Sequence, residues 1–314
     1  MDVVKGMSLK GWTVASLVAN QVIIVTGAIV RVTGSGLGCP TWPQCTADSY
    51  TPHPELGIHG AIEFGNRLLT FVLAAIAVVT FVLAVRAARR GAADRRLARL
   101  ALAAGLGIPL QAVVGGLSVL ARLNPWVVGL HMVLSVALVA LCVKMIHVAW
   151  DVPLVTDAHR GGVLAVRIVT LLGVVVLAAG VVTTGAGPNS GDGAATRNGL
   201  PLELTAKTHA WAAWALVAAT VWALVALRRT TARRAVVLLL VVEILQGIVG
   251  YVQYATHLPL EIVITHMLGT ALFSAALANL AFRVVRSGKQ RVDGGGGEDE
   301  RQIGVRKVEQ AHRP

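Results

Sequence analysis

Apolar residues dominate eight stretches of this chain, and each is close to the roughly 20 residues that a helix needs to cross the hydrocarbon core of a bilayer. Polar and charged residues collect in the segments between them. The pattern predicts an all-α integral membrane protein with eight transmembrane helices. The predicted spans are residues 12–33, 61–85, 99–121, 126–149, 161–184, 205–227, 233–254 and 259–283.

Composition agrees with this fold class and excludes an ordinary soluble domain. The chain has 314 residues, of which 55% are hydrophobic and 14% are charged, and its mean hydropathy is +0.69. No small-residue cleavage site follows the first apolar run. We therefore interpret that run as a retained helix and not as a signal peptide.

The formal net charge of +12 would suit a nucleic-acid partner, but the placement of the basic residues argues against one. They gather before the first span, in residues 86–99 and 228–234, and after the last span, whereas the 34–60 loop has no Lys or Arg. Basic segments stay in the cytoplasm. We predict a multi-pass protein of the plasma membrane, with both termini cytoplasmic and the lipid bilayer as its surroundings.

Two short patterns recur and divide the spans into two halves of four. Gln111 precedes His131 by the same twenty residues that separate Gln246 from His266, and Met follows each His. Thr-Gly-Ser-Gly from residue 33 resembles Thr-Gly-Ala-Gly from residue 184. Because four spans return the chain to the same side, the halves are predicted to be parallel repeats related by an axis along the membrane normal. The predicted parts are a cytoplasmic N-terminus (1–11), an N-terminal four-helix half (12–149), a cytoplasmic linker (150–160), a C-terminal four-helix half (161–283) and a disordered cytoplasmic tail (284–314).

Three histidines, His131, His209 and His266, fall near the outer ends of the fourth, sixth and eighth spans. An ionisable side chain inside the membrane is a functional-site hypothesis by default. Imidazole is a common iron ligand, and His side chains from facing helices hold heme in helical bundles. The alternative is that each His only hydrogen-bonds to a neighbouring helix.

A carboxylate lies at the outer start of the second span. His59, Glu63, Asn66 and Arg67 are spaced to share one face of a helix. Glu63 is a candidate for general acid/base work or for stabilising a developing cation. The alternative is a structural Glu63–Arg67 pair across one helical turn.

Polar residues at the outer side complete the candidate set. Cys39 and Cys45 lie six residues apart with prolines between them, which on the oxidising side favours a disulfide, although a dithiol redox relay is an alternative. Arg31 and Arg67 flank the outer ends of the first two spans, where they either snorkel to the interface or pair with an anionic substrate.

Taken together, these residues resemble the heme A synthase family, which converts heme O to heme A for terminal oxidases. The similarity covers roughly residues 12–283. The matching pieces are the Gly27–Cys45 segment with its Arg-Val-Thr-Gly-Ser-Gly and Cys-Pro-Thr-Trp-Pro motifs, the Glu63–Arg67 segment, and the two Gln…His-Met patterns.

The resemblance implies a heme pocket near the outer face of each half. His209 and His266 would be the axial ligands of a heme b cofactor. The first half would bind the substrate heme O, with His131 on its iron and Glu63 beside the C8 methyl group, which becomes a formyl group through an alcohol and a hydrated aldehyde. The family also implies a Cys39–Cys45 disulfide and a place in cytochrome oxidase assembly, with heme O synthase (protoheme farnesyltransferase) as a candidate partner.

The chain departs from the family at one position. The family has Glu-x-x-His in the first half, but Asn66 stands where the His is expected, as in an actinobacterial-type variant. A neutral amide is a poor iron ligand, so either His131 alone holds the substrate iron or His59, two turns earlier, takes the place of the missing ligand. The substrate pocket is therefore predicted to contain His131, Asn66, His59, Arg67 and Arg31.

Two other functions fit parts of the pattern. A membrane diheme electron-transfer cytochrome would prefer four equivalent histidines spread over both leaflets, whereas the candidate ligands here all lie on one side. A heme or metal transporter is compatible with parallel repeats. The sequence makes no prediction of the oligomeric state.

Overall fold

The computed structural model describes residues 8–156 and 158–284. Within these ranges it contains eight long α-helices, and each is long and apolar enough to cross a membrane. A short 3-10 helix, Pro54–Leu56, precedes the second of them. The helices are α1 (Leu9–Val32), α2 (Gly57–Arg89), α3 (Arg95–Leu120), α4 (Pro125–Ala149), α5 (Arg160–Ala186), α6 (Leu202–Ala226), α7 (Arg233–Ala255) and α8 (Leu260–Arg283).

The prediction of an all-α membrane protein with eight spans is confirmed. Every helix covers its predicted span to within a few residues, and α2 extends the predicted 61–85 span at both ends. Polar caps define several starts. Asp94 accepts a hydrogen bond from the Arg96 amide at 2.7 Å, and Asn124 accepts one from the Trp126 amide at 3.0 Å. These caps satisfy amides that an isolated helix end leaves without partners.

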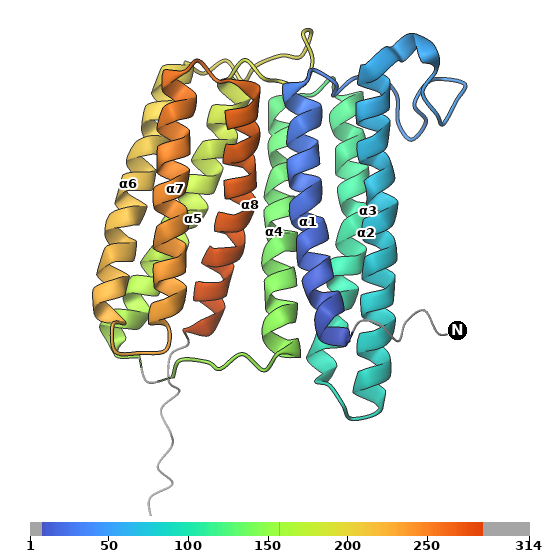
Figure 1. Cartoon of the computed structure of the whole chain (residues 1–314). Helices are drawn as coiled ribbons and strands as arrows, with labels where there is room; N and C mark the ends of the chain where they lie inside the picture. Colours follow the sequence, from blue (N-terminus) through green and yellow to red (C-terminus); the bar gives the residue numbers. More distant parts are fainter. Residues whose placement is uncertain (1–7, 157, 285–314) are drawn as a thin grey trace, which may run out of the picture.

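The helices pack as two sets of four (Figure 1). In each set every helix contacts the next one in sequence, and the first also contacts the fourth, which closes a ring. The diagonal pairs, α2 with α4 and α6 with α8, therefore face each other across the middle of a ring. The two sets contact each other mainly through α8, which packs against α1 and α4. Contacts between α4 and α5 add to this interface.

The longest loops lie at one end of the bundle, the upper end in Figure 1, which we call the loop end. It carries residues 33–56 and 187–201, and the Gly36 amide donates to the Gly191 carbonyl at 2.7 Å to join the two loops. The predicted linker forms the 150–159 connection at the opposite end, where a β-bridge pairs Val155 with Val284. The predicted tail, apart from Val284, and most of the predicted N-terminus lie outside the described residues.

Candidate functional site

Two histidines from diagonally opposed helices meet inside the second ring. The ring centroids of His209, on α6, and His266, on α8, lie 6.4 Å apart, and the ring planes are nearly perpendicular at 77°. Since α6 and α8 are not direct neighbours in the ring, the two imidazoles bridge the middle of the four-helix set.

Neighbouring helices hold these imidazoles in place. Nδ1 of His209 lies 3.1 Å from the Val176 carbonyl oxygen on α5. In the tautomer with the proton on Nδ1, this N–H donates a hydrogen bond to the carbonyl, and Nε2 keeps a lone pair that can bind a metal. Metal-binding histidines usually have this arrangement. A methyl group at Gly180 would lie 3.2 Å from Cε1 of His209, and one at Gly250 would lie 3.3 Å from Cε1 of His266. Larger residues would crowd the rings.

Two imidazoles this close, from helices on opposite sides of the ring, could together hold a heme iron, since imidazole is a common iron ligand and His side chains from facing helices hold heme in helical bundles. Nδ1 of His266 is buried without a hydrogen-bond partner among the described residues. Nowhere in the described ranges do three or more His, Cys, Asp or Glu residues gather as a metal site.

The first half repeats part of this arrangement. A methyl group at Gly115 would lie 3.2 Å from Cε1 of His131. Gln111 donates to the His131 carbonyl at 3.3 Å, as Gln246 donates to the His266 carbonyl at 3.1 Å. The recurring Gln…His spacing in the sequence therefore corresponds to the same interhelical hydrogen bond in both halves.

Asn66 lies on α2, the helix diagonal to α4, which carries His131, and its side chain already has a partner. The Thr26 hydroxyl on α1 donates to Oδ1 of Asn66 at 2.7 Å. Methyl groups added at Gly27 or Gly65 would meet no atom within 4 Å. The helix surfaces beside Asn66 are thus open, although among the residues that the structure describes no second imidazole pairs with His131 as His266 pairs with His209.

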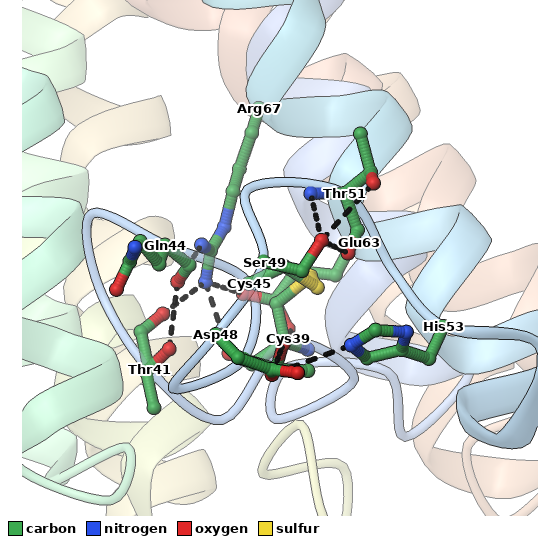
Figure 2. The surroundings of a disulfide bond; sticks show 11 residues. Cys39, Thr41, Gln44, Cys45, Asp48, Ser49, Thr51, His53, Glu63 and Arg67 are labelled. Atoms are coloured by element: carbon green, nitrogen blue, oxygen red, sulfur yellow. Dashed lines mark hydrogen bonds and ion pairs between the residues drawn. A yellow bond between two sulfur atoms is a disulfide. The ribbon is translucent and has the colours of Figure 1, made fainter.

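Glu63 is buried and both of its oxygens are engaged (Figure 2). Oε2 accepts the Cys39 amide at 2.6 Å, and Oε1 accepts a guanidinium N–H of Arg67 at 2.6 Å. The alternative that Glu63 and Arg67 form a pair is therefore realised. A carboxylate held this way has a fixed position and a balanced charge, which is compatible with a structural role and with a catalytic one.

Arg67 anchors the long loop at the same place. In addition to Glu63, its guanidinium donates to the carbonyls of Cys39 at 3.0 Å, Thr41 at 3.0 Å and Gln44 at 3.2 Å. These carbonyls belong to the segment closed by the Cys39–Cys45 disulfide (Figure 2). The contacts support a loop-anchoring role for Arg67, whereas its predicted contact with substrate stays a prediction.

Replacing Arg67 by Lys should loosen this loop. An ammonium group keeps the charge beside Glu63 but lacks the planar guanidinium that donates to several carbonyl acceptors at once, so the hydrogen bonds to the loop carbonyls should be lost. Both cysteines are fully buried, so the measurable result is faster reduction of the disulfide by a water-soluble reductant.

Lys207→Met is the matched control. Lys207 also pairs with a carboxylate one turn earlier, Glu203, but both side chains are exposed. Such surface pairs contribute about 0–1 kcal/mol, so the reduction rate should stay at the wild-type value. An unchanged rate in Arg67→Lys would contradict the anchoring role.

Arg31 performs a similar task for the second loop. Its guanidinium donates to the carbonyls of Asn189 at 2.5 Å and Thr184 at 2.6 Å, so a side chain of the first half holds a loop of the second. This contact explains a charged residue at the end of α1, and the predicted substrate contact of Arg31 stays a prediction.

His59 lies at the loop end of α2 and its residue is exposed. Nδ1 of His59 lies 2.9 Å from the Ser35 hydroxyl. Asn66 lies seven residues, or about 10 Å, farther along the helix. These contacts give no support to the prediction that His59 replaces the missing ligand.

The Cys39–Cys45 disulfide is present, which confirms the loop-closing prediction; the redox relay is not tested by it. On the rim of the same loop, hydrogen bonds from Thr46 and His53 hold the pKa of Asp48 below its ordinary value. Asp48 is therefore ionised at neutral pH and helps to order the exposed part of the loop.

One buried ionisable residue, Glu243 on α7, was not among the site residues predicted from the sequence. It is 6% exposed and lies near the middle of its helix. The signal was present, because Glu243 is the only charged residue between Arg234 and the end of the 233–254 span. A lone carboxyl group in an apolar run does not by itself indicate which chemistry it serves.

Comparison with known proteins places this site in context. A family model for a cytochrome oxidase assembly protein, COX15-CtaA, matches residues 10–278. Heme A synthase of Listeria welshimeri is 29% identical over 153 residues, which cover 48% of this chain and 49% of that protein. Heme A synthase of Lysinibacillus sphaericus is 31% identical over 153 residues, or 48% of each. The chain thus spans about half the length of these curated relatives.

Proposed function

The chain belongs to the COX15-CtaA family of cytochrome oxidase assembly proteins, and on that premise we propose that it is a heme A synthase, a membrane oxidoreductase that converts the C8 methyl of heme O to a formyl group. The observation that carries the proposal is the His209–His266 pair, two imidazoles with ring centroids 6.4 Å apart that would together hold one heme. The relatives named heme A synthase support the same activity.

In this proposal the two halves are parallel repeats that bind different hemes. His209 and His266 hold a heme b cofactor, which supplies electron transfer when bound. His131 binds the iron of the substrate heme O, with Asn66 and the open helix surfaces at Gly27 and Gly65 on the opposite side. The matched Gln111 and Gln246 hydrogen bonds support the repeat.

Glu63 is the proposed catalytic residue of the first half. The Cys39 amide and Arg67 fix its carboxylate, so the negative charge is ready to orient water or to stabilise positive charge that develops beside it. The disulfide loop lies directly against this carboxylate and would limit access of bulk water to it.

The orientation follows from the basic residues. Arg86, Arg89, Arg90, Arg233 and Arg234 lie at or near the helix ends opposite the loop end. The positive-inside rule supports a cytoplasmic location for that face, and with it the proposal that both termini are cytoplasmic and the heme sites lie near the extracytoplasmic face. Heme O synthase and the oxidase assembly machinery are the proposed partners.

Expression in a host that makes heme O but no heme A tests the function. Extracted hemes, separated by chromatography, should then include heme A, and a host carrying the empty vector should show none. A purified protein that contains heme while the host membranes lack any formylated heme would favour an electron-transfer cytochrome or a transporter.

A further inference from the structure

Glu243 is a buried carboxyl group that the proposed reaction leaves unused. Oε1 accepts a hydrogen bond from the Thr220 hydroxyl on α6 at 2.9 Å. Oε2 is buried and has no hydrogen-bond partner among the described residues, and no ion pair of the described chain includes this residue. A carboxyl group in this setting is either protonated or must be able to gain a proton, because an uncompensated negative charge in an apolar interior is costly.

The site lies on the side of the histidine pair that faces away from the loop end. Glu243 precedes Gln246 by one helical turn, and Gln246 holds the carbonyl of His266. Thr220 follows His209 by eleven residues on α6, about 16 Å along the axis. Glu243 itself follows the start of α7 at Arg233 by ten residues, or about 15 Å.

No other titratable group lies at this depth on the helices around Glu243. α7 packs against α6 and α8. The titratable residues of these helices lie near their ends or at the histidine pair, and they are Glu203, Lys207 and His209 on α6, Arg233, Arg234, Tyr251 and Tyr254 on α7, and Glu261, His266 and Arg283 on α8. Among the described residues of α6, α7 and α8, Glu243 is thus the one acid between the histidine pair and the arginine-rich end.

The first half lacks this acid. The repeated Gln…His pattern aligns Gln111 with Gln246. Ile108 precedes Gln111 by three residues, as Glu243 precedes Gln246, so Ile108 is the counterpart of Glu243. Ile108 lines a cavity of about 10 Å³ together with Ser16, Asn20 and Thr80. The carboxyl group is therefore particular to the half with two histidines, where the proposed function puts the permanently bound heme.

We propose that Glu243 is a redox-linked proton site, which takes up one proton when the heme held by His209 and His266 gains one electron. The inference rests on the proposed function, because it needs a heme at this pair. The electron comes from a one-electron donor and converts ferric to ferrous iron, while the carboxylate takes a proton from water and becomes a carboxylic acid. The buried region keeps its net charge, which avoids the cost of adding an unbalanced charge inside the membrane.

Spectroelectrochemical titration of the purified heme-loaded protein tests the coupling. The midpoint potential of the low-spin heme with two histidine ligands is measured over about three pH units around neutrality. In the wild type it should fall as the pH rises, because reduction takes up a proton. Glu243→Gln should remove that slope, whereas Glu243→Asp, which keeps an ionisable carboxyl group, should restore it.

Glu261→Gln is the matched control, since Glu261 lies in the first turn of α8 and is exposed. Its slope should equal that of the wild type. An independent readout is the reduced-minus-oxidised infrared spectrum of the wild type, which should contain a carboxylic acid C=O band that Glu243→Gln lacks.

The outcomes separate this inference from the proposed function. A wild-type protein that binds no heme overturns both. A heme-loaded protein with a flat midpoint potential, or with the same slope in Glu243→Gln, overturns the proton site alone. If Glu243→Gln does not retain heme, the wild-type slope and the infrared band decide, and the absence of either refutes the coupling.

Discussion

Heme A should disappear from membranes of the heme O-producing host when Glu63 is replaced by Gln, while the heme of the second half stays bound. Gln keeps the size of the side chain but removes the charge, and a positioned acid or base typically contributes about 10²–10⁴-fold to rate. The yield of heme A, measured by chromatography of extracted hemes, should fall by this order. The spectrum of the purified protein should still contain the low-spin heme.

Two variants separate chemistry from loop anchoring. Gln satisfies only one of the two donors that meet Glu63, the Cys39 amide and Arg67, so some loosening of the loop is expected. Arg67→Lys loosens the same loop while keeping the carboxylate, and it should retain measurable heme A. Glu203→Gln, in the exposed pair on α6, should behave as the wild type. Normal heme A yield in Glu63→Gln would refute the catalytic role.

Replacement of His209 or His266 by Ala should abolish the low-spin heme signal of the second half. Each change removes one of two imidazoles whose centroids lie 6.4 Å apart. Even changes in groups that only support a ligand weaken metal binding about 10–100-fold, and loss of a direct ligand should exceed that. Optical spectra and heme content per protein measure the effect, and heme A formation should fall with it.

His147→Ala is the control for this pair. His147 is also a buried helical histidine, but its Nε2 lies 2.9 Å from Oδ1 of Asn279 on α8, and it lies near the end of α4 that is remote from the loop end. Its heme content should match the wild type. Retention of a six-coordinate low-spin heme in both His209→Ala and His266→Ala would show that the iron ligands lie elsewhere.

Much of the molecule could be predicted from the order of residues alone. The eight spans follow from apolar runs of bilayer length, because a backbone without water must satisfy its hydrogen bonds within a helix. Glu63, His131, His209 and His266 were predicted as candidate site residues because polar side chains are costly inside such runs. The disulfide followed from two nearby cysteines in the long loop, and these local properties do not depend on how the helices are arranged.

The partners of these residues were decided only by the tertiary structure. From the sequence, Arg31 and Arg67 could either snorkel to the interface or contact an anionic substrate, and the structure adds that their guanidinium groups donate to loop carbonyls. Those carbonyl acceptors are brought to the helix ends only by the folded loops. The approach of His209 and His266 across the ring, and the meeting of Glu243 with Thr220, depend on the rotation of each helix about its axis. That rotation is set by packing against neighbouring helices, which no single stretch of sequence contains.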